Sequence, residues 1–554
     1  MLENLRKTFS IGRKALLLIV AGSLAWALTM VKSGLRYDYG VGFWGPNGHD
    51  GVWHLSLARS LASGSLEMPI FAGEQIKNYH LGFDLLLALV NRITALPVSV
   101  LYFQIFPPIM AIFIGFLTYK FVLNWKKSQA AAFWSTFFVY FGGNLGWILT
   151  LLKGGGLGGE SVFWAQPAIL TLINPPYAMS LVFILLGLNL MIRLKIIPSA
   201  IVFGLLIQIK AYAGIILLGA LLPLALYEYW KKHTFNYLKL LVISCVISFV
   251  IFLPNLTSGS LLEFKPFWFL ETMMSFPDRV GWSQFGEAMV NYRLGGQWLK
   301  AFAAYGIALL IFWYGNLGTR FVDEFYWVKI IKSKKLELID VFIGSAIVIG
   351  LLGAMLFVQK GTAWNTIQFY YYSLFFVSII AGVVFAKIKT NLLVAGALIF
   401  MLPTTVGALK HYLPSRPPAM ISNDELDALE FLSNQPKGVV LVMPFDRQAA
   451  SDAADNPPRP LYLYESTAYV SAYSSQPVWL EDEVNLDITG YDWQARRKKL
   501  VGMLKRNNQS EMKEFLREEN ISYVYVVEPG NIVFEGLTKQ YSENGVRIYK
   551  LGYN

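Results

Sequence analysis

Apolar runs long enough to cross a lipid bilayer dominate this chain. They occupy about 15–31, 98–122, 130–150, 168–190, 237–254, 298–315, 338–358, 368–386 and 391–411, and 198–229 is long enough for a hairpin broken near Lys210. A membrane-spanning helix needs about 20 mostly apolar residues. Only 15% of the residues are charged, against roughly 25% in soluble domains. The sequence therefore predicts an α-helical polytopic membrane protein with about eleven spans.

Basic residues are concentrated in the membrane part. Residues 422–554 hold 14 Lys and Arg against 20 Asp and Glu, which leaves 33 basic and 16 acidic residues for 1–421. Cytoplasmic loops of membrane proteins are enriched in Lys and Arg. All the clusters of Lys and Arg fall on one side of the membrane if the short segment 81–96 lies in the outer interface and does not cross the bilayer. We therefore expect a plasma-membrane protein with a cytoplasmic N-terminus, and nucleic acid is an unnecessary partner.

Composition changes after Pro414, Pro417 and Pro418. Beyond them the pattern predicts helices over 424–432 and 496–520 and strands over 438–443, 523–527 and 546–551. About 130 residues can bury a core of their own. The sequence thus predicts two domains: a transmembrane domain over 1–414 and an extracytoplasmic soluble α/β domain over 422–554.

The loop after the first apolar helix contains His49, Asp50 and His54 at the start of an amphipathic stretch. That stretch and 81–96 are both expected to be interfacial helices. A helix dipole would keep Asp50 ionised, as suits a base. The competing interpretation is that Asp50 only caps the helix and His54 is an interface residue. Since no third ligand follows at a definite spacing, we predict no metal site.

Four segments resemble the first part of the GT-C glycosyltransferases: HDGVWHLSLARSLASG (49–64), NYHLGFDLLLAL (78–89), KFVLNWKK (120–127) and GGGLGGES (154–161). This group includes the protein O-mannosyltransferases and the bacterial aminoarabinose transferases, and it uses polyprenyl-phosphate sugars as donors. The resemblance covers residues 1–230. It implies a GT-C-like transmembrane domain with a catalytic base in the first outer loop.

Residue roles follow from that resemblance. It implies Asp50 as the base and Glu160 as a second outer acid, and Ile209-Lys210-Ala211 is similar to the family's Thr-Lys-Gly. Where the family often has a Lys-Pro-Pro-Leu-like segment, this chain has Asn78-Tyr79-His80-Leu81. The phosphate contact is therefore assigned to His80, with Lys77 in reserve. The first loop lacks an Asp-x-Asp pattern, which argues against the metal-dependent branch.

Other candidates rest on the residues themselves. A lysine inside an apolar stretch, such as Lys210, is expected to be functional unless it snorkels to the interface. Arg293 lies in an aromatic-rich outer loop. Lys360, Trp364, Asn365 and Gln368 lie at the outer mouth of two spans and are candidates either to line the same cavity or to form an ordinary solvated loop. Tyrosines in the segment 461–473, LYLYESTAYVSAY, offer an acceptor-binding surface or an ordinary sheet edge.

The sequence therefore predicts an integral-membrane glycosyltransferase that moves a sugar from a polyprenyl-phosphate carrier to a glycan, lipid or protein acceptor on the outer face. The catalytic candidates are Asp50, His54 and Glu160. The substrate-binding candidates are His49, Lys77, His80, Lys210, Arg293 and Lys360. We expect no metal and no cofactor. Two alternatives remain open: a non-enzymatic lipid or glycan transporter, and a polysaccharide polymerase.

Overall fold

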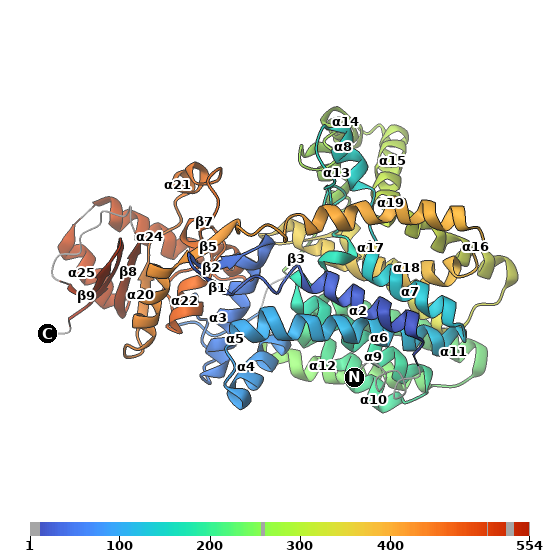
Figure 1. The fold of residues 1–554 in the computed structure, drawn as a ribbon, viewed down its shortest axis with the longest axis horizontal. Helices are drawn as coiled ribbons and strands as arrows, with labels where there is room; N and C mark the ends of the chain where they lie inside the picture. The colour runs from blue at the N-terminus through green and yellow to red at the C-terminus, as the bar shows by residue number, and fades with distance from the viewer. Residues whose placement is uncertain (1–10, 256–260, 507, 528–536, 553–554) are drawn as a thin grey trace.

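The computed structural model describes residues 11–255, 261–506, 508–527 and 537–552. It has a bundle of long helices at one end and the C-terminal part at the other (Figure 1). The first loop, coloured dark to light blue, lies between them. Mostly helical secondary structure with long apolar segments confirms the predicted membrane class.

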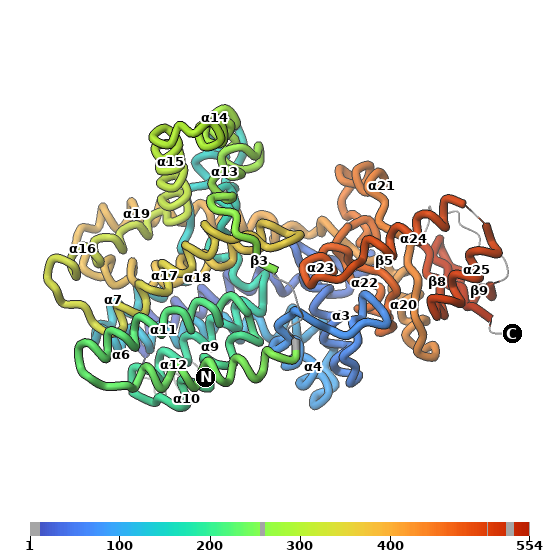
Figure 2. Tube along the Cα trace, turned by 180° about the vertical axis from the view of Figure 1, so that it is seen from behind, coloured from blue at the N-terminus to red at the C-terminus, as the bar shows by residue number. Residues whose placement is uncertain are grey.

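The bundle is built from helices that lie roughly along the long axis (Figures 1 and 2). Their bounds are α2 (Arg13–Ala27), α6 (Phe106–Lys126), α7 (Gln129–Phe141), α9 (Pro175–Ile192), α10 (Ile196–Ile209), α11 (Ala211–Lys232), α12 (Asn236–Phe252), α16 (Asp323–Ser333), α17 (Leu338–Leu356), α18 (Ile367–Phe385) and α19 (Asn391–Leu409). Short segments α5 (Val98–Val100) and a π-helical turn (Leu101–Ile105) lead into α6.

A smaller group of helices projects sideways from the bundle (Figures 1 and 2). It comprises α8 (Gly146–Leu152), α13 (Trp268–Ser275), α14 (Ser283–Leu294) and α15 (Trp298–Leu317). A 3₁₀ turn, Gly318–Val322, joins α15 to α16. A two-stranded antiparallel pair, β3 (Leu262–Phe264) with β4 (Phe357–Gln359), ties the start of this region to the end of α17.

Seven helical segments in the described part of the chain are long and apolar enough to cross a membrane, and the bent pair α7–α8 would make eight. The other predicted spans are also helical, but α2, α10 and α12 have only 15, 14 and 17 residues. The break predicted near Lys210 is confirmed, since α10 ends at Ile209 and α11 begins at Ala211. The total of eleven remains a prediction.

The first loop forms two helices of different character. Helix α4 (Gly82–Thr94) buries Phe83 and Leu87 and exposes Leu85, Leu89 and Ile93, as an interfacial helix should. Helix α3 (Asp50–Ala62) is instead buried on most of its surface. Its Ser56 hydroxyl lies 2.8 Å from that of Ser471. The C-terminal part therefore covers a face of α3 that was expected to lie in the membrane interface.

Two four-stranded sheets organise the rest. The first has the order β1-β2-β5-β7, from β1 (Arg36–Tyr37), β2 (Gly40–Phe43), β5 (Ala419–Ser422) and β7 (Arg459–Pro460). The second has the order β6-β8-β10-β9, from β6 (Val439–Val442), β8 (Ile521–Val527), β9 (Thr538–Glu543) and β10 (Val546–Lys550). Strands β6 and β8 are parallel, and the other pairs of the second sheet are antiparallel.

The C-terminal part of the described chain also contains six helices. They are α20 (Asn423–Ser433), α21 (Arg447–Asp452), α22 (Tyr469–Ser474), α23 (Glu483–Thr489), α24 (Trp493–Arg506) and α25 (Gln509–Glu518). Of these, α20 packs against β9 and β10, and α25 packs against β8. The helices and strands predicted after residue 422 are therefore confirmed, with the segment 496–520 divided into two helices. The domain bounds 1–414 and 422–554 stay a prediction.

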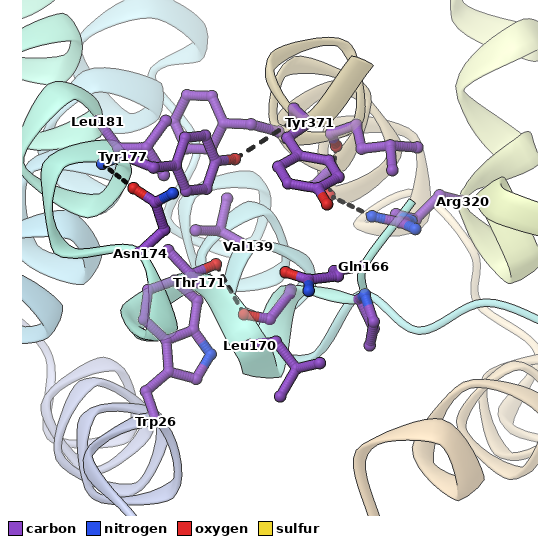
Figure 3. Close-up of a pocket in the computed structure, with 15 residues that line it drawn as sticks. Trp26, Val139, Gln166, Leu170, Thr171, Asn174, Tyr177, Leu181, Arg320 and Tyr371 are labelled. Atoms are coloured by element: carbon purple, nitrogen blue, oxygen red, sulfur yellow. Dashed lines mark hydrogen bonds between the residues drawn. The ribbon is translucent and has the colours of Figure 1, made fainter. Parts of the chain in front are cut away.

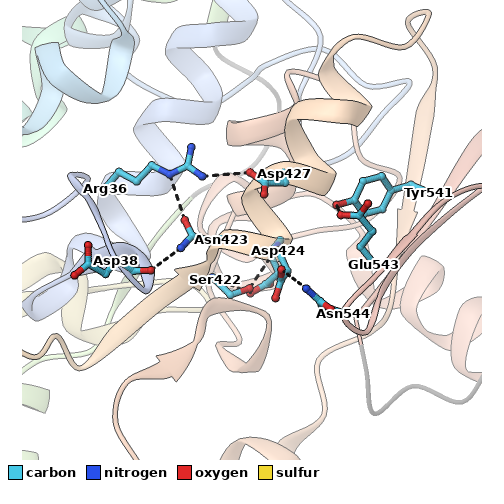
Figure 4. A network of polar contacts seen from close by, with 10 residues as sticks. Arg36, Asp38, Ser422, Asn423, Asp424, Asp427, Tyr541, Glu543 and Asn544 are labelled. Carbon is cyan, nitrogen blue, oxygen red and sulfur yellow. Dashed lines mark hydrogen bonds and ion pairs between the residues drawn. The ribbon is translucent and has the colours of Figure 1, made fainter.

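Strand pairing and polar contacts hold the first loop against the C-terminal part. Residues 40–43 of β2 pair with β5 over its whole length. Beside them, Arg36 pairs with Asp427 at 3.2 Å and donates to the side chain of Asn423, which donates to the carbonyl of Asp38 (Figure 4). This joint fixes the position of the loop that carries Asp50.

Candidate functional site

A cavity of about 360 Å³ lies where the first loop, the bundle and the C-terminal part meet. Small-molecule sites are usually 300–1,000 Å³ clefts at such junctions. Its lining combines polar groups with aromatic and aliphatic walls. The polar lining residues are Asp50, His54, Asn78, Tyr79, His80, Tyr102, Asn174, Lys210, Tyr212, Gln359, Asn365, Gln368 and Asn485.

Asp50 stands at the N-terminus of α3 and faces the cavity. It does not cap the helix, because no side chain provides a cap hydrogen bond there. Its Oδ1 lies 2.9 Å from His49 Nδ1. Burial alone would raise the pKa of Asp50, but the positive charges of His49, His54 and Lys210 outweigh burial and hold that pKa below its usual value. The carboxylate is therefore ionised at neutral pH.

His54 lies one helical turn beyond Asp50 and is held from behind by Asp84 of α4. His54 Nδ1 and Asp84 Oδ1 are 2.7 Å apart, and the exposed fractions of the two side chains are 7% and 0%. The imidazole stacks on Tyr102 with ring centroids 5.6 Å apart. Because an ionised carboxylate only accepts hydrogen bonds, Nδ1 carries the hydrogen and Nε2 is free for the cavity.

Lys210 occupies the extended residue between α10 and α11. Its ammonium donates to Asn174 Oδ1 at 3.5 Å and otherwise faces the cavity. The residue is 6% exposed, and its charge acts on both Asp50 and Asp84. A lysine so far inside the fold does not snorkel to an interface. The carboxylates of Asp50 and Asp84 balance the positive charge of Lys210.

His80 lines the cavity opposite these charges, and its Nε2 is buried without a hydrogen-bond partner among the described residues. Burial, with Lys210 and His54 adding to it, lowers the pKa of His80 well below its ordinary value. His80 is thus a neutral donor or acceptor there. Lys77 lies just outside, with its ammonium 4.3 Å from the centre of the Tyr491 ring.

An amide cluster forms the far wall. The side chain of Gln359 accepts from Tyr212 at 2.8 Å and from Asn365 at 2.7 Å, and Gln368 bonds to Asn365. Such groups suit the recognition of hydroxyls, because amides both donate and accept.

A smaller cavity of about 40 Å³ adjoins the first through the shared residue Asn174. Arg320, Tyr371, Gln166 and Trp26 surround it (Figure 3). Arg320 donates to the carbonyls of residues 143, 316 and 317 and to Ser378. The volume holds only a few water molecules, so the larger cavity is the candidate site.

The structure brings together five of the nine predicted site residues: Asp50, His54, His80 and Lys210 line the cavity, and His49 pairs with Asp50 beside it. Glu160 does not line the cavity; it pairs with His411 at 3.2 Å. Arg293, on the projecting helix α14, pairs with Glu271 at 3.0 Å. Lys360 and Lys77 are also outside the lining. Sequence order alone gave no means of separating these four from the others.

Sequence reasoning missed Asp84, Asn174 and Gln359, whereas it named Asn365 and Gln368 of the amide wall. Asp84 was visible as an acid within the apolar stretch 81–96, which is a costly position for a charge. Asn174 precedes Pro175 and Pro176 and accepts a capping bond from Tyr177 N. Nothing in the sequence linked either residue to Asp50. No cluster of three metal-ligating side chains occurs in the described ranges.

The overall architecture of this chain resembles that of solved structures. It is similar to the apo form of the Archaeoglobus fulgidus oligosaccharyltransferase, at 10% sequence identity and a TM-score of 0.51, over 92% of this chain and 69% of that one. This chain has the same overall fold as that oligosaccharyltransferase. At this level of identity the likeness establishes the fold, as the resemblance of the first 230 residues implied.

A structure of archaeal oligosaccharyltransferase AglB from the same organism, in complex with an inhibitory peptide and a dolichol-phosphate, is also similar. It has 12% identity and a TM-score of 0.49, over 99% of this chain and 75% of that one, a score too low to add to the comparison. No protein-family model and no curated protein sequence matches the chain. The roles of the residues therefore rest on the geometry of the site.

Proposed function

We propose that the protein is a membrane glycosyltransferase that moves a sugar from a polyprenyl-phosphate carrier to an acceptor, with Asp50 as the general base. The observation that carries the proposal is one cavity in which an ionised carboxylate and a buried lysine face the same space. The GT-C fold is consistent with such chemistry, but a fold alone does not define a function.

The two charges have complementary tasks in such a reaction. Asp50 takes the proton of the acceptor hydroxyl or amide as that atom bonds to the anomeric carbon. The bond from that carbon to the phosphate oxygen breaks, and the phosphate leaves with the electron pair. One displacement inverts the anomeric centre. General-base assistance of this kind contributes about 10²–10⁴-fold in rate.

Lys210 is placed to stabilise the departing phosphate. Charge that develops in a site shielded from water is stabilised strongly by a fixed opposite charge. His80 adds a neutral hydrogen-bonding group, and a bound phosphate would favour its protonated form. His54, held by Asp84, presents Nε2 to the same space. The exposed apolar face of α4 would let a lipid tail approach from the bilayer.

The direct test is product release. Purified protein in lipid nanodiscs is incubated with a panel of polyprenyl-phosphate sugars and a lipid extract, and free polyprenyl phosphate is measured by mass spectrometry. We expect release from at least one donor in the presence of an acceptor. A transporter would move the lipid or glycan across a vesicle membrane and leave the donor intact, and that outcome would overturn the proposal.

A further inference from the structure

A second large cavity lies inside the C-terminal part, apart from the Asp50 cavity. Its volume is about 330 Å³. Val442 and Val527, at the carboxyl ends of the parallel strands β6 and β8, both line it. Ligands of α/β folds characteristically bind outside the carboxyl ends of parallel strands. The tyrosine-rich segment 461–473, which the first site does not use, supplies one wall.

Aromatic rings and carboxylates make up the polar lining. Five aromatic side chains take part: Phe445, Tyr462, Tyr464, Tyr469 and Tyr525. So do five carboxylates: Asp446, Glu465, Glu481, Asp482 and Glu483. No Lys or Arg is among the described lining residues. Aromatic faces and carboxylates both attract cations.

The deep carboxylates lack enough positive partners. Glu483 pairs with Arg497, whereas Glu481 accepts only from the backbone of Val470 and Ser471 and from the Ser471 hydroxyl. Burial raises the pKa of Asp482 to about 6 and that of Glu481 to about 8. At neutral pH Glu481 is therefore mostly protonated, and a bound cation would stabilise the negative charge of Asp482.

A second observation also points to a ligand. Tyr525 lines the cavity and is 2% exposed. Its hydroxyl interacts with the side chain of Tyr469, another lining residue, but meets full hydrogen-bond geometry with no described residue. A buried hydroxyl without a well-formed hydrogen bond costs free energy. A ligand with a donor or acceptor at this point would remove that cost.

Helix α23 contributes side chains to both this cavity and the Asp50 cavity. Helix α23 begins at Glu483 beside the acidic cavity, while Asn485 and Ile488 of the same helix line the Asp50 cavity. Against the effect of burial, the negative charges of Asp50 and Asp482 both raise the pKa of His49. A molecule that reaches from one cavity to the other would therefore pass α23.

We propose that this second cavity binds a cationic group, an ammonium or a guanidinium, carried by the acceptor. The cation lies against the faces of the aromatic rings. Glu465 and Asp482 supply the opposite, negative charge. The idea extends the proposed glycosyl transfer by naming a property of its acceptor. Binding here needs neither a donor nor Asp50, so it can be tested separately.

The test uses the full chain in nanodiscs and two small probes, Nα-acetyl-lysine methylamide and Nα-acetyl-norleucine methylamide. They share the same carbon chain and differ in the ammonium. Binding is followed by ligand-observed NMR. We expect the lysine probe to bind, the norleucine probe not to bind, and salt to weaken the binding.

Variants define the site. Glu465→Gln and Asp482→Asn should each weaken binding of the lysine probe by about tenfold, a typical effect of a charge-assisted contact. Asparagine can still cap α23, so the fold should survive. The control Asp455→Asn removes an exposed charge of the same domain outside the lining and should have no effect. Asp50→Asn should also bind normally, which separates this result from any loss of transfer.

The proposal is wrong if both probes bind equally. It is also wrong if neither probe binds at a concentration 10 to 20 times a weak dissociation constant of about 1 mM. Unchanged affinity in folded Glu465→Gln and Asp482→Asn proteins would contradict it as well.

Discussion

Against the effect of burial, three neighbouring basic side chains, His49, His54 and Lys210, lower the pKa of Asp50. Both histidines pair directly with an acid, whereas Lys210 has no direct ion pair in the described part of the chain. The positive charge of Lys210 interacts with Asp50 and Asp84. With a phosphate bound, it would exchange that role for a direct contact. The same residue can therefore keep the base ionised and receive the leaving group.

Lys210→Met removes the ammonium and retains most of the side-chain length. We expect donor binding to weaken by about tenfold or more, because a charge-assisted phosphate contact is lost. The measurement is the dissociation constant for polyprenyl phosphate in nanodiscs, with Lys77→Met as the matched control outside the cavity. Equal affinity of Lys210→Met and the parent would mean that Lys210 has only a structural role.

Asp84→Asn tests whether Asp84 positions His54. Asparagine can replace one hydrogen bond but not the charge, and its amide can instead favour the other imidazole tautomer. We expect about 10- to 100-fold lower transfer and a changed pH profile, the usual range for a group that orients another. The chain has only five histidines, so ¹⁵N NMR can follow the His54 tautomer. Asp38→Asn, an exposed first-loop change, is the control. An unchanged tautomer and pH profile would contradict the positioning role.

Among the elements, the pairing of β2 with β5 matters most for the site, because it connects the loop of Asp50 to the C-terminal part. Gly40 lies in this pairing with φ +124°, and a Cβ there would lie 2.0 Å from the carbonyl oxygen of Ile421. Only glycine fits both the backbone conformation and the close approach.

Gly40→Ala should therefore destabilise the joint by about 1–3 kcal/mol or more. We expect faster protease cleavage between residues 413 and 419 and a lower midpoint of thermal unfolding. Gly306→Ala, where nothing lies within 4 Å of the added Cβ, is the control. If Gly40→Ala matches that control, the strand pairing does not hold the two parts together.

Local patterns predicted elements well where the signal was contained within the element. The break at Lys210 was visible as one charge in an apolar run, and α20 was visible from its capping residues Ser422 and Glu425. Strand β5 was missed because its partner, β2, lies far away in sequence. The exposure of α3 was misjudged for the same reason, since α22 covers it. Four predicted residues, including Glu160, lie apart from Asp50 and outside the cavity lining. Positions along the sequence do not show which loops come together in the fold.

At the scale of the whole molecule, the arrangement requires the cavity and the C-terminal part to share one side of the membrane. Helix α16, which Lys335 follows, lies in the bundle, and helix α21, which Asp455 follows, lies in the C-terminal part on the other side of the first loop (Figure 2). In a Cys245→Ser background, Asp455→Cys should react with a membrane-impermeant thiol reagent in intact cells, and Lys335→Cys should react only after lysis. Labelling of Lys335→Cys in intact cells would reverse the predicted orientation.

The central claim is that an ionised Asp50 does chemistry in the cavity. Asp50→Asn preserves side-chain size and can still bond to His49, but asparagine cannot accept a proton. Transfer from a donor that the parent protein uses should fall by about 10²–10⁴-fold or more, while thermal stability and binding of polyprenyl phosphate stay close to the parent's. Transfer by a folded Asp50→Asn protein within a few-fold of the parent's would contradict the account.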